Sequence, residues 1–170
     1  APVVTEEVYK RVMDQVILPS VAGMAEDGND YTGFLYAGLM ISPDGEVSVV
    51  EFNCRFGDPE AQPIMMRLQS DLPELCLAAI NQSLDAHTAQ WDSRCAVGIV
   101  LASGGYPGAY AKGAIISGLE KHSSEHQKVF HAGTALKDGE VVTSGGRVLC
   151  ATALGLSVEE AKSAAYAVVK

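Results

Sequence analysis

The chain has 170 residues, of which 48% are hydrophobic and 19% are charged. This balance excludes a disordered chain, because the apolar content is sufficient for a core and the charge density is low. The net charge of −9 argues against nucleic acid or an anionic membrane as a partner, since an acidic surface repels phosphate groups. The longest apolar stretches, 34–41 and 95–102, are far shorter than the roughly 18 residues that span a bilayer.

The cysteines indicate a reducing compartment. Cys54, Cys76, Cys95 and Cys150 are widely spaced and form no C-x-x-C pair, which is typical of reduced core thiols in a cytoplasmic protein. The first residues carry neither an initiator methionine nor the regions of a signal peptide. We therefore expect a piece of a longer cytoplasmic chain.

The first third of the chain predicts a helix followed by a hairpin. Thr5 can cap a helix that continues to about Val21, and Pro19 should kink or interrupt it because proline removes a donor. A polar loop over 23–30 precedes a strand over 31–41. Odd- and even-numbered residues of this strand are both apolar, which suits a strand that is covered on both faces.

A tight turn at 43–45 should fold the run 46–53 back as the second strand of that hairpin. Because strand side chains alternate, we expect one face to carry the residues Val47, Val49, Glu51 and Asn53. The polar side chains of Glu51 and Asn53 should therefore lie next to each other at the end of one strand face.

The rest of the chain predicts helices over 61–68 and 71–84, and then a polar segment around Trp91. We place the domain boundary there, which gives domains 1–92 and 93–170. The second domain should contain short strands over 95–103, 129–131, 140–143 and 148–152, with a final helix that opens at a Ser157 and Glu160 capping box. The expected fold class is α+β.

The strongest chemical signal is the run 51–60. A carboxylate and an amide oxygen two residues apart, at Glu51 and Asn53, can both bind a hard cation such as Mg²⁺, which often completes its shell with water and nucleotide phosphates. Arg55 offers a two-pronged donor to a phosphate or carboxylate, and Asp58 could hold a substrate amine or orient Arg55. The alternative is a solvent-facing edge strand followed by a loop ion pair between Arg55 and Asp58.

The runs 31–40 and 51–60 closely resemble the phosphoribosylamine-glycine ligase family of the ATP-grasp superfamily. The later segments 102–108 and 145–150 resemble the C-terminal domain of the same family. The resemblance covers essentially the whole chain in the right order. It implies the C-terminal part of an ATP-grasp domain, with an antiparallel sheet, followed by a small α+β domain.

The resemblance also implies a function. Members of this family use ATP to join glycine to 5-phosphoribosylamine through a glycyl phosphate intermediate, which forms glycinamide ribonucleotide in purine synthesis. It implies that Glu51 and Asn53 bind Mg²⁺ or Mn²⁺, and that Arg55 and Asp58 position the acyl phosphate and the substrates.

Two departures from the family pattern affect these expectations. Many ATP-grasp enzymes carry a third acidic ligand on the preceding strand, but twelve residues before Glu51 this chain has Leu39. The chain also lacks the portion of the family that holds the phosphoribosylamine domain and the adenine contacts. We therefore expect weak nucleotide affinity, no catalysis by the chain alone, and a tendency to form homo-oligomers through apolar surface left uncovered.

Parts of the sequence also fit other functions. Another ATP-grasp carboxylate ligase would share the metal strand but not the run 55–60, and a non-catalytic binding module would keep only the fold. The pattern His122-Ser123-Ser124-Glu125-His126 matches an inverted zinc-peptidase motif, but its neighbours provide no apolar helix face. The glycine-rich run 104–108 lacks the lysine of a phosphate-binding loop and is better explained as a structural turn.

Overall fold

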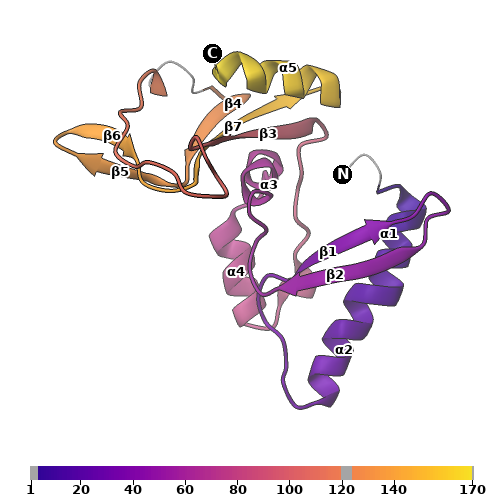
Figure 1. The fold of residues 1–170 in the computed structure, drawn as a ribbon. Helices are drawn as coiled ribbons and strands as arrows, with labels where there is room; N and C mark the ends of the chain where they lie inside the picture. Colours follow the sequence, from indigo (N-terminus) through magenta and orange to yellow (C-terminus); the bar gives the residue numbers. More distant parts are fainter. Residues whose placement is uncertain (1–3, 120–123, 170) are drawn as a thin grey trace. The chain divides into compact units, whose positions relative to one another are not determined.

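The computed structural model describes residues 4–119 and 124–169, which form two compact units (Figure 1). The first, which we call the hairpin unit, comprises 4–57 and 73–87. The second, which we call the sheet unit, comprises 58–72 and the described residues from 88 onward. The predicted division at residue 92 concerns the domains of the longer family fold and stays a prediction.

The hairpin unit begins with one nearly continuous helical segment. It consists of α1 (Glu6–Val12), the π-helical turn η1 (Met13–Ile17) and α2 (Leu18–Glu26). The side chain of Thr5 accepts a hydrogen bond from the Val8 amide at 3.3 Å, as the capping prediction requires. Pro19 is the second residue of α2, just after the π-helical turn. Since proline lacks a donor and crowds the preceding turn, the helix widens there instead of ending. The predicted loop over 23–30 is wrong in its first half, because α2 continues to Glu26.

The predicted hairpin is present as strands β1 (Tyr36–Ile41) and β2 (Val47–Asn53), which pair antiparallel. In the turn, the Gly45 amide donates to the Ser42 carbonyl at 2.9 Å, and Gly45 adopts a φ of +82° that favours glycine. Strand β1 starts five residues later than predicted, at Tyr36. The expected coverage on both faces is also wrong, since the residues of both strands are exposed or half-buried.

Two further segments complete the helical part of the hairpin unit. They are α4 (Leu72–Ile80) and the short 3₁₀ turn η2 (Leu84–Ala86), which together replace the single predicted helix over 71–84. None of the helices within the described residues is both long enough and apolar enough to cross a membrane. All four cysteines are free, as predicted, although only Cys150 is buried.

The sheet unit is built around one long, buried strand. Strand β7 (Arg147–Gly155) lies between β3 (Cys95–Ala102) and β4 (Gln127–His131), and both neighbours pair with it antiparallel. The remaining elements are α3 (Ala61–Arg67), the separate ribbon of β5 (Thr134–Lys137) and β6 (Glu140–Thr143), and α5 (Val158–Val169). The ribbon strand β5 is absent from the prediction. Strand β6 has the predicted ends, and β3, β4 and β7 match the prediction with shifted ends.

The two faces of this sheet carry different helices (Figure 1). A side chain at Gly155 would place its Cβ 2.4 Å from the Ala161 amide nitrogen, so α5 packs directly on the end of β7. On the other face, a Cβ at Gly98 would lie 2.9 Å from Cys150 Sγ and 3.2 Å from Pro63 Cγ, so the small residue makes room for α3. The segment that follows residue 58 is therefore part of the core of the sheet unit.

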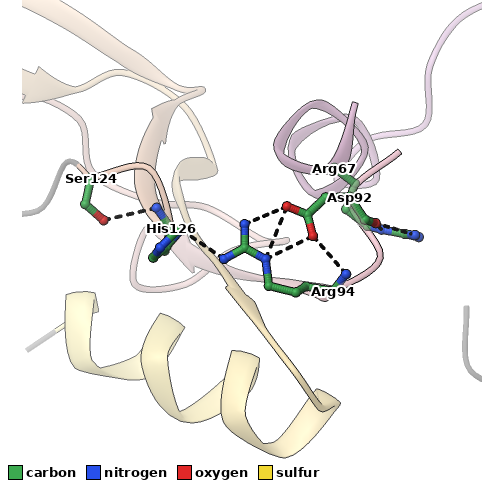
Figure 2. Close-up of polar contacts among 5 residues, drawn as sticks. All are labelled: Arg67, Asp92, Arg94, Ser124 and His126. Carbon is green, nitrogen blue, oxygen red and sulfur yellow. Dashed lines mark hydrogen bonds and ion pairs between the residues drawn. The ribbon is translucent and has the colours of Figure 1, made fainter. Parts of the chain in front are cut away.

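A polar network fixes the segment between α4 and β3 to α3 (Figure 2). The Asp92 carboxylate accepts hydrogen bonds from the Arg94 guanidinium at 2.6 and 2.9 Å, and the Asp92 carbonyl accepts two from Arg67. Arg94 Nη1 also lies 3.0 Å from His126 Nδ1, which must accept because a guanidinium only donates. Arg94 holds the pKa of Asp92 well below its usual range, chiefly through the side-chain hydrogen bonds.

This network also bears on the zinc-peptidase pattern. His122 and Ser123 lie outside the described residues, and His126 contacts Arg94. Among the residues that the structure describes, there is no group of three His, Cys, Asp or Glu side chains that could hold a metal ion.

The lowered pKa of Asp92 predicts a pH-dependent contribution to stability. A carboxylate with a folded-state pKa below its unfolded value of about 3.8 stabilises the fold fully above that pH and progressively less as the pH falls further. Asp92→Asn should therefore lower the melting temperature at pH 7, and the difference from the original chain should shrink below about pH 4. Thermal unfolding at pH 3 to 7 measures this difference, with Asp30→Asn as an exposed control. A difference that stays constant over this range would contradict the assignment.

Candidate functional site

Glu51 and Asn53 lie together on one face of the β1–β2 hairpin. The strand register pairs Asn53 with Tyr36 and Glu51 with Gly38. Asn53 Nδ2 donates a hydrogen bond to Glu51 Oε1 at 2.9 Å, so the two side chains meet. The prediction that this pair shares a face is confirmed.

A β-bulge sets which face this is. The register shifts between Gly38 and Leu39: Gly38 pairs with Glu51 but Leu39 pairs with Val49, which leaves Val50 without a partner on β1. Consecutive residues of β1 point to opposite faces, so their partners Glu51 and Val49 also do so. The prediction that Val47 and Val49 share the face of Glu51 and Asn53 is therefore wrong, because it assumed unbroken alternation.

The bulge separates a polar face from an apolar face. Leu39 and Ile41 line a groove together with Val8 of α1, on the side away from Glu51. The members of this apolar face are Ala37, Leu39, Ile41, Val47, Val49 and Phe52. Leu39, where many ATP-grasp enzymes have a third acidic ligand, thus lies on the wrong side of the hairpin to reach a cation held by Glu51.

Gly38 gives the Glu51 side chain its space. A Cβ at this position would lie 3.0 Å from Glu51 Cγ and 3.6 Å from the Tyr36 ring, so all three residues occupy the same face. Neither Gly38 nor Tyr36 was among the predicted site residues. The signal that could have found them is their position directly across the hairpin from the two polar residues.

The donor set on this face suits a hard divalent cation. The internal hydrogen bond uses one Glu51 oxygen and the amide nitrogen of Asn53, which leaves the second Glu51 oxygen and the Asn53 carbonyl oxygen as hard oxygen donors. Mg²⁺ and Mn²⁺ prefer such ligands and accept a shell completed by water and phosphate oxygens. The residues present therefore fit a cation held by two protein side chains.

Arg55 lies in the loop that follows this strand, in the hairpin unit. Its Nη1 donates to the carbonyl of Phe56 at 2.8 Å, and the side chain is exposed. The Phe56 ring lies 4.0 Å from the ring of Phe34, and the Tyr31 hydroxyl donates to the Phe34 carbonyl at 2.6 Å. The segment before β1 thus packs against the loop that carries Arg55.

Asp58 belongs to the sheet unit, where it pairs with Arg147. Arg147 Nη2 donates to Asp58 Oδ2 at 2.8 Å, and Nη1 donates to the Asp58 carbonyl at 3.4 Å. Burial raises the pKa of the Cys150 thiol, and the charge of Asp58 adds to that rise. Arg147 was not among the predicted site residues, because 89 residues separate it from Asp58 in the sequence.

The glycine-rich run 104–108 forms a structural turn, as predicted. Gly105 has a φ of +100°, and a Cβ there would lie 2.3 Å from the Ala109 carbonyl oxygen. The Tyr106 ring packs so closely on Gly146 that a Cβ at Gly146 would lie 2.2 Å from it. Close packing therefore accounts for the glycines at positions 105 and 146.

Sequence comparison finds two matching domain families. Residues 1–61 match "Phosphoribosylglycinamide synthetase, ATP-grasp (A) domain", and residues 96–170 match "Phosphoribosylglycinamide synthetase, C domain". The chain is 64% identical over 170 residues to a phosphoribosylamine-glycine ligase of Vibrio vulnificus, covering all of this chain and 40% of the relative. It is 61% identical to one of Escherichia coli O157:H7, covering 99% of this chain and 40% of the relative.

A solved structure has the same fold. The crystal structure of phosphoribosylamine-glycine ligase from Thermotoga maritima matches with a TM-score of 0.72 and 34% sequence identity, covering 99% of this chain and 40% of that one. This chain thus spans about two fifths of the length of the proteins it matches.

The close approach at Gly38 predicts the effect of a single methyl group. In Gly38→Ala the new Cβ should push the Glu51 side chain away from Asn53, because 3.0 Å is too short for an ordinary carbon contact. The side-chain amide signals of Asn53 in an amide NMR spectrum should shift as they do in Glu51→Ala. Gly23→Ala is the control, since nothing lies near that position. Unchanged Asn53 signals in Gly38→Ala would show that Gly38 does not set the position of Glu51.

Proposed function

Because the chain belongs to the phosphoribosylglycinamide synthetase family, we propose that it supplies the cation-binding strand and the C-terminal domain of an ATP-dependent ligase. The proposed reaction joins glycine to 5-phosphoribosylamine and yields glycinamide ribonucleotide, ADP and phosphate. The observation that carries this proposal is the pair of oxygen ligands at Glu51 and Asn53 on the face opposite the apolar groove.

The proposed reaction has two steps. A glycine carboxylate oxygen attacks the γ-phosphorus of ATP, which releases ADP and forms glycyl phosphate. The amine of phosphoribosylamine then attacks the glycyl carbonyl, the amide bond forms, and phosphate leaves with the electrons of the broken C–O bond. Activation as an acyl phosphate is needed because a free carboxylate has a poor leaving group.

The residues of this chain have distinct proposed roles. Glu51 and Asn53 hold Mg²⁺ or Mn²⁺, which when bound supplies positive charge that offsets the charge of the transferring phosphoryl group. Arg55 contacts an anionic group of the acyl phosphate, for which a planar guanidinium is suited. Asp58 orients the substrates. ATP, glycine and 5-phosphoribosylamine are thus the proposed small-molecule partners.

Further expectations follow from the same proposal. The domains are proposed to divide near residue 92, and the enzyme is proposed to act in the cytoplasm. Homo-oligomers of the isolated chain are proposed to form through exposed apolar side chains of the hairpin unit, among them Met40, Leu77 and Ile80. The alternative ATP-grasp ligase is disfavoured by the 61–65% identity to relatives named phosphoribosylamine-glycine ligase.

A hybrid ligase tests the proposed function. In this hybrid, the chain replaces the matching 170 residues of the Vibrio vulnificus relative. The hybrid should release ADP only when both glycine and phosphoribosylamine are present. Glu51→Ala should lower its turnover by about 100-fold or more at saturating Mg²⁺, because one of two protein ligands is lost.

The controls separate loss of function from loss of fold. Glu46→Ala, in the turn before β2, removes a carboxylate outside the proposed cation site. It should keep most of the turnover. A folded hybrid without glycine-dependent ADP release, or a Glu51→Ala hybrid with near-normal turnover, would contradict the proposal. The first outcome would favour a binding module that has lost catalysis.

A further inference from the structure

We propose that Arg147 is a positioning residue for Asp58, and that β7 of the C-terminal domain thereby fixes the start of the run 58–67. This inference rests on the proposed function, because it assigns Arg147 a part in the same reaction through Asp58. Arg147 lies at the start of β7, and Asp58 lies just ahead of α3. Both belong to the sheet unit.

The contact between these residues has two points. One guanidinium donates both to the Asp58 carboxylate, at 2.8 Å, and to the Asp58 backbone carbonyl, at 3.4 Å. A single-point contact leaves a side chain free to rotate about it. Contacts to both the side chain and the main chain of Asp58 instead fix the direction of the carboxylate and the path of the backbone.

Arg147 is itself held by an unusually close junction of three loops. Its carbonyl accepts a hydrogen bond from the Gly133 amide at 2.8 Å, and a Cβ at Gly133 would lie 2.6 Å from that same carbonyl oxygen. The Ser103 amide donates to the Gly146 carbonyl at 2.7 Å, and Ser103 Oγ donates to the Gly145 carbonyl at 2.8 Å. The glycines of this junction therefore keep the Arg147 backbone in one place.

The other end of the segment is fixed as well. Three residues after Glu60, Pro63 packs against Gly98, and Arg67 donates two hydrogen bonds to the Asp92 carbonyl. The run 58–67 is thus anchored at its start by Arg147 and at its end by Asp92. A change in the position of the Arg147 side chain can therefore move Asp58 without disturbing α3.

Stability alone does not account for this ion pair. The Arg147 and Asp58 side chains are 39% and 54% exposed. Solvent-exposed ion pairs contribute little to the free energy of unfolding, because water screens the charges and two long side chains must be ordered. A geometric role for the contact is the more economical explanation.

Double-mutant kinetics in the hybrid ligase test this role. Arg147→Lys keeps the charge but cannot make both contacts, and should lower kcat by about 10- to 100-fold with a smaller change in KM for ATP. Asp58→Ala should lower kcat by at least as much. The double variant Asp58→Ala with Arg147→Lys should be no slower than Asp58→Ala alone, since Arg147 acts through Asp58. Lys162→Ala, an exposed ion-pair partner on α5, is the control and should keep normal turnover.

Hydrogen exchange on the unmodified 170-residue chain gives a readout that does not depend on catalysis. Amides at the start of the run 58–67 should exchange severalfold faster in Arg147→Lys than in the original chain, whereas Lys162→Ala should leave them unchanged.

The outcomes separate this inference from the proposed function. Additive kinetic losses, normal turnover in Arg147→Lys, or unchanged exchange in the run 58–67 would each overturn the role of Arg147 while Glu51→Ala still abolished turnover. A hybrid that makes no glycinamide ribonucleotide at all would overturn the proposed function, and the exchange measurement would still decide whether Arg147 anchors Asp58.

Discussion

The β-bulge opposite Gly38 and Leu39 is the constraint on which the candidate site depends. With unbroken alternation, Val47, Val49, Glu51 and Asn53 would share one face, and that face could not be both a packing surface for α1 and a polar cation site. The unpaired Val50 shifts the alternation by one residue. The valines then lie on the same face as Leu39 and Ile41, and Glu51 and Asn53 lie on the other face.

The bulge also explains the small residue across the hairpin. Because Glu51 pairs with Gly38, its side chain passes over a position without a Cβ. The internal hydrogen bond to Asn53 then orients both side chains before any cation is present. Preorganised ligands lose less conformational freedom on binding, so this arrangement favours a site with few protein ligands. Such a site does not need a third acidic ligand, and position 39 is a leucine.

Much of the fold and part of the site could be predicted from the sequence. Thr5, the turn at Gly45 and the α5 capping pattern are local signals, and each corresponds to the observed structure because it acts within a few residues. Glu51 and Asn53 share a face because they are two residues apart on one strand, and the prediction holds because both lie beyond the bulge. The bulge itself has no local signature, so the face shared with Val49 was predicted wrongly.

Contacts distant in sequence account for the remaining differences. Arg147 reaches Asp58 only because β7 is central in its sheet and α3 packs on that sheet, and neither fact is encoded near residue 58. The packing of the run 58–72 with the later strands has the same cause. Sequence spacing therefore identifies Glu51 and Asn53, and tertiary packing identifies Arg147 as the partner of Asp58.

The most direct test of the role of the bulge is the turnover of the hybrid ligase after insertion of one alanine between Gly38 and Leu39. The inserted residue gives Val50 a partner on β1, so alternation along both strands becomes unbroken and Glu51 shares a face with Leu39 and Val49, whereas Val50→Ala keeps the bulge and changes only an exposed side chain. We expect the insertion to abolish glycine-dependent ADP release in a protein that still folds, and Val50→Ala to retain most of the activity. Substantial activity in the folded insertion variant would contradict the account.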